Sequence, residues 1–205
     1  RVSELAARLG KPATALSRPL HVLADLGLIV RETPWAAAER DSKRSFYRIA
    51  DPFLAFWYRF VEPNRSLLEA RRLEPVGETV RLGWGQHVGG VWESLCREAV
   101  TGNDVAGQVW ARPARWWGPG RDRRPLELDV VATSLDGTAL LVGEAKVAIR
   151  GQEQAIAARL VAKARQFPAA AGRRLVPVIF HADEGVTPVK GVEFVGADAV
   201  LSRSR

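Results

Sequence analysis

The stretch "LELDVVATSLDGTALLVGEAKV", residues Leu126–Val147, contains two apolar runs joined by Asp136 and Gly137. An Asp-Gly pair between such runs predicts a β-hairpin, because a type I′ turn needs a positive φ at both of its central positions. In that turn Leu135 pairs with Thr138, and this pairing sets the register of the two strands. The rest of the predicted fold is built outward from this hairpin.

The predicted register places charged residues opposite one another. Asp129 would face Glu144 and Glu127 would face Lys146, and the alternation of a strand puts all four on one face. The opposite face would carry Leu126, Leu128 and Val130. A cross-strand salt bridge explains the Glu127–Lys146 pair. Directly opposed residues have Cβ atoms roughly 4.5–5.5 Å apart, and two like charges placed there destabilise a sheet. Two carboxylates held that close must share a proton, lie in water or bind a cation.

The Asp129–Glu144 pair therefore predicts a metal site. Hard divalent cations such as Mg²⁺ take carboxylate and carbonyl oxygens and keep several waters. The alternatives are a solvated sheet edge and a vestigial site.

Composition restricts the class of protein. The 205 residues are 47% hydrophobic and 26% charged, which is typical of a globular chain of one or two domains. The net charge of +7 and pI of about 10.3 favour a polyanionic partner, although high Arg usage also reflects GC-rich genomes. A single cysteine excludes an intramolecular disulfide and a Cys-based zinc site.

The chain has no signal peptide and no run of about 18 apolar residues, so we expect a cytoplasmic protein without a membrane segment. It begins at Arg1 and contains no methionine, so we expect further sequence to precede it.

Residues 1–50 predict a helix, a turn, a second helix that ends at Gly27, and a hairpin. This order is typical of a winged helix-turn-helix, in which the second helix enters a DNA groove and the hairpin contacts phosphate. The alternative is a winged helix that docks another protein. The candidate DNA contacts are Lys11, Thr14, Arg18, His21, Lys43 and Arg44.

Residues 51–85 predict a connector. The segment "DPFLAFWYRFVEPN" (51–64) is dense in aromatic residues and predicts a buried helix. Residues 65–85 predict a helix and a linker broken at Gly77, Gly83 and Gly85.

Residues 86–205 predict a second domain of order αβββαββ, with a terminal helix after the last strand. This order predicts a mixed sheet with helices on its faces, and the fold class is α/β (mixed α+β). Glu93 lies at the edge of the first helix's buried face. Of Trp116 and Trp117, at least one should be in the core, because neighbouring strand residues face opposite ways. A basic loop, residues 118–125, either contacts phosphates or is a solvated turn; it contains Arg121, Arg123 and Arg124.

A helix with Glu93, a three-stranded meander with Asp129 and then "EAK" (144–146), a helix and a strand resemble the PD-(D/E)xK nuclease superfamily, which has the restriction-endonuclease-like fold. The resemblance implies that Asp129 and Glu144 hold Mg²⁺ or Mn²⁺, with the backbone carbonyl of Ala145 as a further ligand. Lys146 would orient or activate the attacking water, and Glu93 would reach the metal directly or through water. Many such nucleases pair two sites, which makes a homodimer plausible.

A wider resemblance covers nearly the whole chain. The segments "DPFLAFWYRFVEP", "GGVWESLCRE", "RWWG" and "LLVGEAKV" resemble the C-terminal region of archaeal-type DEXX-box ATPases, which joins a winged helix to a PD-(D/E)xK-like domain. An ATPase precedes this region in that family. No G-x-x-x-x-G-K-[ST] motif occurs here, so a nucleotide site would lie outside this chain or be absent.

Three functions fit these observations. The first is a Mg²⁺-dependent DNA endonuclease module, the C-terminal part of an ATPase. The second is a non-catalytic DNA-binding or regulatory module of an ATPase. The third, a transcription regulator that uses the winged helix alone, leaves the carboxylate pair unexplained.

Overall fold

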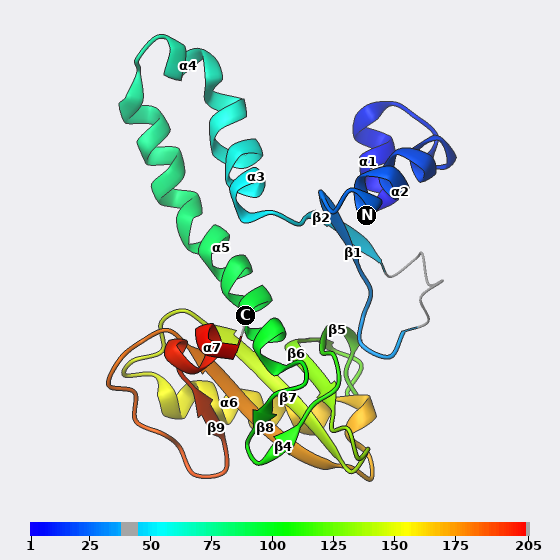
Figure 1. The fold of residues 1–205 in the computed structure, drawn as a ribbon, viewed down its shortest axis with the longest axis vertical. Coiled ribbons are helices and arrows are strands. Elements are labelled where there is room, and N and C mark those ends of the chain that lie inside the picture. The colour runs from blue at the N-terminus through cyan, green and yellow to red at the C-terminus, as the bar shows by residue number, and fades with distance from the viewer. Residues whose placement is uncertain (38–44, 204–205) are drawn as a thin grey trace. The chain divides into compact units, whose positions relative to one another are not determined.

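The structure is a computed structural model that describes residues 1–37 and 45–203. It is a mixed α and β protein whose chain divides into two compact units (Figure 1). The first unit comprises Arg1–Thr33 and Ala37–His87, and the second comprises Val88–Arg205 together with Pro34–Ala36.

The first unit begins with helices followed by a two-stranded antiparallel hairpin. Gly27 follows the second helix with a φ of 69°, so it ends that helix as its position predicted. Pro19 lies in the first turn of this helix, where proline is tolerated. The elements are α1 (Val2–Leu9), the 3₁₀ turn η1 (Ala13–Leu16), α2 (Ser17–Asp25), β1 (Ile29–Glu32) and β2 (Phe46–Ile49).

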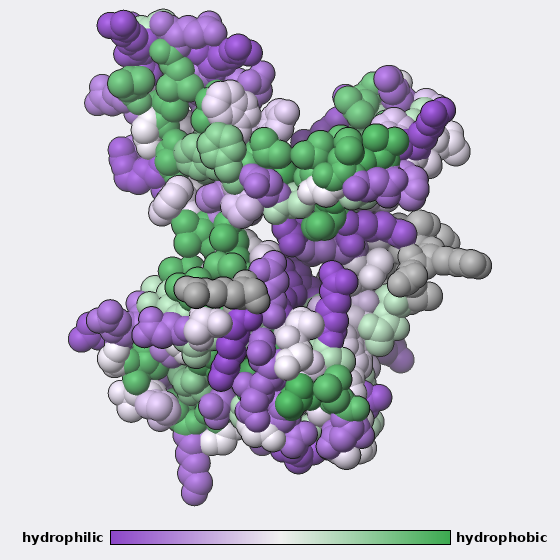
Figure 2. All heavy atoms as spheres, viewed as in Figure 1, coloured by the Kyte–Doolittle hydropathy of each residue, from purple (hydrophilic) through white to green (hydrophobic). Residues whose placement is uncertain are grey.

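The aromatic segment that follows is helical, but most of it is not buried. Phe53, Trp57 and Tyr58 are 65%, 38% and 58% exposed, whereas Phe60 is 2% exposed. Figure 2 shows hydrophobic surface over the helices of this region. The prediction of a buried connector was wrong, because aromatic density does not reveal which side chains a fold covers. The elements are α3 (Pro52–Phe56), the π-helical turn η2 (Trp57–Val61), η3 (Glu62–Asn64), α4 (Arg65–Glu69) and α5 (Leu73–Val100).

The three glycines that were expected to break the chain lie inside the continuous helix α5. Gly83 shows why a glycine can be useful there. A Cβ atom at this position would lie 2.5 Å from Cε1 of Phe60, so the absence of a side chain lets the two segments approach closely. Glycine costs a helix about 1 kcal/mol relative to alanine, and this packing offsets that cost.

The second unit is built on a sheet of order β5-β6-β7-β8-β9. The pairs β5–β6 and β6–β7 are antiparallel, and β7–β8 and β8–β9 are parallel. After the end of α5 its elements are β3 (Asp104–Val105), β4 (Gln108–Val109), β5 (Ala114–Pro119), β6 (Pro125–Thr133), β7 (Ala139–Lys146), α6 (Glu153–Gln166), η4 (Pro168–Ala170), β8 (Arg174–His181), β9 (Glu193–Val195) and α7 (Ala197–Arg203).

Helices cover both faces of this sheet (Figure 1). On one face Trp92 and Cys96 of α5 join Phe180 of β8 in a buried cluster, to which α7 also contributes. On the other face α6 packs on the strands, and there Trp116 contacts Phe167 with ring centroids 4.8 Å apart. Trp116 is therefore the core member of the tryptophan pair.

The central hairpin has the predicted register but a different turn. The ladder runs from Thr133 opposite Leu140 to Val130 opposite Gly143. Within the turn the φ of Gly137 is 75°, whereas that of Asp136 is not positive, so the turn is not type I′. The Asp136 carboxylate instead accepts a hydrogen bond from the backbone N–H of Thr138 at 3.0 Å. This side-chain bond stabilises a wider loop without left-handed backbone at Asp136.

A β-bulge interrupts β6 next to Asp129. Ala114 pairs with Val131 and Trp116 pairs with Leu128, so β6 contains one extra residue between these pairs. As a result Leu128 packs on the α6 side of the sheet and Val130 packs on the α5 side. The expectation that these two residues share a face was wrong, because a bulge resets the alternation.

Candidate active site

Asp129 lies at this bulge and is 7% exposed. Its Oδ2 accepts a hydrogen bond from the backbone N–H of Ala145 on β7 at 3.0 Å. The β6–β7 ladder ends at Val130 and Gly143. The carboxylate therefore joins the two strands just beyond their last backbone pair, which holds it at the open end of the hairpin.

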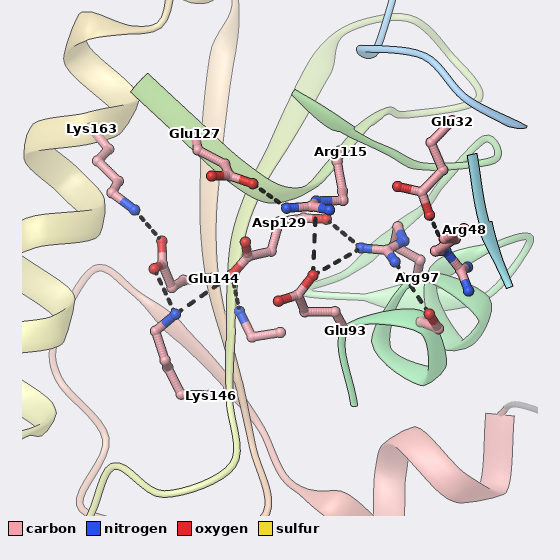
Figure 3. Close-up of polar contacts among 12 residues, drawn as sticks. Glu32, Arg48, Glu93, Arg97, Arg115, Glu127, Asp129, Glu144, Lys146 and Lys163 are labelled. Atoms are coloured by element: carbon pink, nitrogen blue, oxygen red, sulfur yellow. Dashed lines mark hydrogen bonds and ion pairs between the residues drawn. The ribbon is translucent and has the colours of Figure 1, made fainter. Parts of the chain in front are cut away.

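Glu144 lies on β7 between two lysines. Lys146 Nζ lies 2.9 Å from Glu144 Oε1 and 3.7 Å from Asp129 Oδ2. Lys163 on α6 donates from Nζ to Glu144 Oε2 at 2.8 Å. Figure 3 shows the two lysines approaching Glu144 from different elements. Lys146 thus bridges the two carboxylates that were predicted to oppose each other.

The two carboxylates have opposite pKa shifts. Burial and the nearby charge of Glu144 raise the pKa of Asp129 above its ordinary value. Burial acts on Glu144 in the same direction, but hydrogen bonds from Lys163 and Lys146 outweigh it and lower the pKa of Glu144. Burial opposes the charge on Lys146, yet its contacts with Glu144 and Asp129 raise its pKa overall. Lys146 is therefore protonated at neutral pH.

Glu93 extends the network along α5. Its Oε2 lies 3.8 Å from Arg97 Nη1 and 3.8 Å from Arg115 Nε. Arg97 also donates to the backbone carbonyl of Asp129 at 3.0 Å. Burial and the charge of Asp129 raise the pKa of Glu93. The third predicted carboxylate therefore lies beside the bulge and is electrostatically coupled to Asp129.

The predicted ion pair between Glu127 and Lys146 is not formed. Glu127 binds Arg115 of β5 instead, and Lys146 binds Glu144. The reason is the bulge, which ends the regular pairing of β6 with β7 before either residue is reached.

Three cationic residues of the network were not predicted from the sequence: Arg97, Arg115 and Lys163. Arg97 had a signal, since it lies four residues after Glu93 on a helix, where opposite charges are neighbours. Lys163 follows the buried Leu160 by three residues and so lies beside the buried stripe of α6. Its approach to Glu144 depends on the crossover of α6 over the sheet, which no local pattern shows.

The donor set suits a hard divalent cation. Two carboxylates, those of Asp129 and Glu144, lie at one end of the hairpin, and Ala145 follows Glu144 on β7. Carboxylate and backbone carbonyl oxygens are ligands that match Mg²⁺. The raised pKa of Asp129 is the property that a cation would reverse. Across residues 1–37 and 45–203, no group of three or more His, Cys, Asp and Glu side chains is arranged to hold a metal ion. A cation here would thus have two side-chain ligands, the rest being carbonyl and water.

The predicted DNA contacts lie at the surface wherever the structure describes them. In the first unit Lys11 and Thr14 precede α2, and Arg18 and His21 lie on it, with His21 Nε2 3.4 Å from Asp25 Oδ2. Lys43 and Arg44 lie outside the described residues. In the second unit the exposed basic residues of the β5–β6 turn are Arg121, Arg123 and Arg124.

Comparison with known proteins gives two similarities. Residues 57–157 match the model of the family DUF234, described as archaeal and bacterial proteins of unknown function. The chain is also 26% identical over 148 residues to an uncharacterized protein of Methanocaldococcus jannaschii, an alignment that covers 71% of this chain and 32% of that protein. The chain thus spans about a third of that relative. The family match contains Glu93, Asp129, Glu144 and Lys146.

None of the helices in the described part of the chain is long and apolar enough to cross a membrane.

Proposed function

We propose that this chain is a divalent-metal-dependent nuclease module that hydrolyses phosphodiester bonds in DNA. The observation that carries the proposal is the buried Asp129 beside Glu144, with Lys146 within 3.7 Å of the first and 2.9 Å of the second. Acidic oxygens gathered with a lysine at the open end of a hairpin match the needs of this reaction. The substrate is an anion, and its phosphate charge must be neutralised while water attacks.

The reaction forms a bond between a water oxygen and phosphorus and breaks the bond to a sugar oxygen, which leaves as a hydroxyl. When bound, a divalent cation would neutralise the phosphate and make water more acidic. Asp129, Glu144 and the Ala145 carbonyl would hold it. Lys146 is protonated, so it would donate a hydrogen bond to the attacking water or to a phosphate oxygen rather than remove a proton. Glu93, held by Arg97 and Arg115, would act through an intervening water.

The surrounding chain suits the same role. A winged helix in residues 1–50 would bind DNA, and the net charge of +7 favours a polyanion. We further propose that the chain is the C-terminal part of a cytoplasmic ATPase, as its resemblance to DEXX-box ATPases implies. Most of the Methanocaldococcus jannaschii relative lies outside the alignment, which is consistent with additional domains. We also propose that two copies of the module associate as a homodimer.

A second candidate is a non-catalytic DNA-binding or regulatory module. It is favoured by the balance of charge around the site, because Lys146 and Lys163 neutralise Glu144 and the two arginines contact Glu93. Such a network satisfies buried charges without any metal.

Cleavage assays separate the two candidates. Supercoiled, single-stranded and branched DNA are incubated with the protein in Mg²⁺, Mn²⁺ or EDTA. The nuclease predicts cutting that needs metal and is lost in Asp129→Asn, with the exposed Asp198→Asn as the matched control. Absence of cutting on every substrate, together with DNA binding unaffected by Asp129→Asn, would support the non-catalytic module.

A further inference from the structure

A hollow of about 570 Å³ lies beside the turn between β5 and β6. It is lined by Trp117 and Pro119 of β5 and by Leu126 and Glu127 of the neighbouring strand β6. Arg123 of the turn completes the lining. The volume lies within the range of roughly 300–1,000 Å³ that is typical of small-molecule sites. Apolar and aromatic surfaces with one arginine and one glutamate therefore line a space that could hold a single nucleotide.

The walls of this hollow are held by the sheet. Trp117 pairs with Glu127, Gly118 with Leu126 and Pro119 with Pro125 in the β5–β6 ladder. Trp116 points into the core on the other side, so the alternation of β5 directs Trp117 to the opposite face. A preformed wall loses little conformational freedom when a ligand binds.

The turn that bears Arg123 is also held in place. Gly120 and Arg124 form a backbone hydrogen bond of 2.8 Å, and the N–H of Arg123 donates to the carbonyl of Gly120 at 2.9 Å. The N–H of Arg121 donates to the carbonyl of Gln166 at the end of α6 at 2.9 Å. Arg123 has a φ of 64°, which is uncommon for a residue with a side chain. These bonds maintain the backbone conformation of Arg123, which lines the hollow.

A series of side-chain contacts joins the lining of the hollow to the carboxylate site. Glu127 lines the hollow and binds Arg115, and Arg115 Nε lies 3.8 Å from Glu93 Oε2. Glu127 therefore belongs both to the lining of the hollow and to the network that holds Glu93. Arg121 and Arg124 lie at the same turn and add positive charge.

We propose that this hollow binds an unpaired nucleobase of single-stranded nucleic acid, with the base stacked on Trp117 and the adjoining phosphate on Arg123. Aromatic stacking tolerates every base, and cationic residues beside the ring follow the backbone. A base within a duplex is covered by its neighbours and cannot enter. The inference rests on the proposed nuclease and specifies its substrate as a single strand, a flap or a branch with unpaired nucleotides.

The test is equilibrium binding in EDTA, measured by fluorescence anisotropy with labelled DNA. The probes are a strand of twelve thymidines, a sugar–phosphate strand of the same length without bases, and a duplex of the same length. We expect the wild type to prefer the thymidine strand, and Trp117→Ala to bind it about 10-fold more weakly. Trp117→Phe should retain binding, since it keeps an aromatic face. Trp84→Ala, which removes a tryptophan of the first unit that is 50% exposed, is the control.

Arg123 has its own variant. Arg123→Asn removes the cation but keeps a residue that tolerates a positive φ. It should weaken binding of both single-stranded probes and lower the salt dependence of binding.

Equal affinity of wild type and Trp117→Ala for thymidine strands would overturn the proposal, as would equal affinity of the wild type for strands with and without bases. Binding of an acidic peptide that competes fully with DNA would also overturn it. Because no cleavage is needed, the outcome is independent of the proposed function. Trp117-dependent binding without metal-dependent cutting would leave the hollow as a binding site and remove the nuclease.

Discussion

The carboxylate of Asp129 and the backbone N–H of Ala145 form a 3.0 Å hydrogen bond across β6 and β7 just where their ladder ends. The two strands are thus joined at their open end by a group that is also a candidate metal ligand. Stability and activity should therefore depend on Asp129 in different ways.

Asp129→Ala removes the acceptor of a buried N–H, which costs about 1–3 kcal/mol. Asp129→Asn keeps an oxygen in that place and removes the charge. We expect Asp129→Ala to unfold at a lower urea concentration than Asp129→Asn, while both lose cleavage. Equal stabilities for the two variants would show that the Ala145 bond contributes nothing.

The raised pKa of Asp129 predicts how metal-free stability depends on pH. Because its folded pKa lies above the ordinary 3.8, the folded state holds the proton more tightly than the unfolded state. The free energy of unfolding should therefore fall as pH rises from 3.8 through the folded value. Asp129→Asn should remove this fall in urea titrations at successive pH values. A decline of the same size in the variant would assign it to other groups, such as Glu93.

The pKa of Glu144 is shifted in the opposite direction, so its effect on the pH dependence of stability has the opposite sign. Its folded pKa lies below the ordinary 4.5, so its stabilising contribution is complete above pH 4.5 and is lost as pH falls through the folded value. Lys163→Gln removes the 2.8 Å hydrogen bond to Oε2 and should raise the pKa of Glu144. The acidic limb of the pH–rate profile for cleavage should then move to higher pH. Lys163→Arg should restore it, and the exposed Lys190→Gln should leave it unchanged.

A divalent cation should stabilise the folded protein by linkage. At ten times its dissociation constant, Mg²⁺ or Mn²⁺ adds about 1.4 kcal/mol if it binds the folded state alone. Thermal unfolding with and without metal measures this gain. We expect it in the wild type and in Glu184→Gln, an exposed control, and not in Glu144→Gln. An undiminished gain in Glu144→Gln would place the cation elsewhere.

Short-range patterns predicted much of the fold. The register of the central hairpin followed from where the Asp136-Gly137 pair lies between two apolar runs, and it holds although the turn itself is of another type. The helix stop at Gly27 was equally local. The continuity of α5 was not predicted. Gly83 leaves room for the ring of Phe60, which lies 23 residues earlier, and the local sequence of the helix does not show this contact.

The part of the site that depends on local sequence was also predicted. Asp129, Glu144 and Lys146 belong to one hairpin, so sequence spacing could bring them together. No residue type in β6 indicates the bulge at Asp129. The bulge is the reason that Glu127 pairs with Arg115 and not with Lys146. Lys163 reaches Glu144 only through the packing of α6 on the sheet.

The most direct test of the central claim is the single-turnover rate of DNA cleavage in saturating Mg²⁺, comparing Lys146→Gln with Lys190→Gln. Lys146→Gln replaces the ammonium that acts on the reacting phosphate or water by a shorter, neutral amide, which should slow cleavage by at least about 100-fold, while Lys190→Gln should stay near the wild-type rate. Cleavage by Lys146→Gln at the wild-type rate would contradict the account, because the lysine would then serve only to neutralise Asp129 and Glu144.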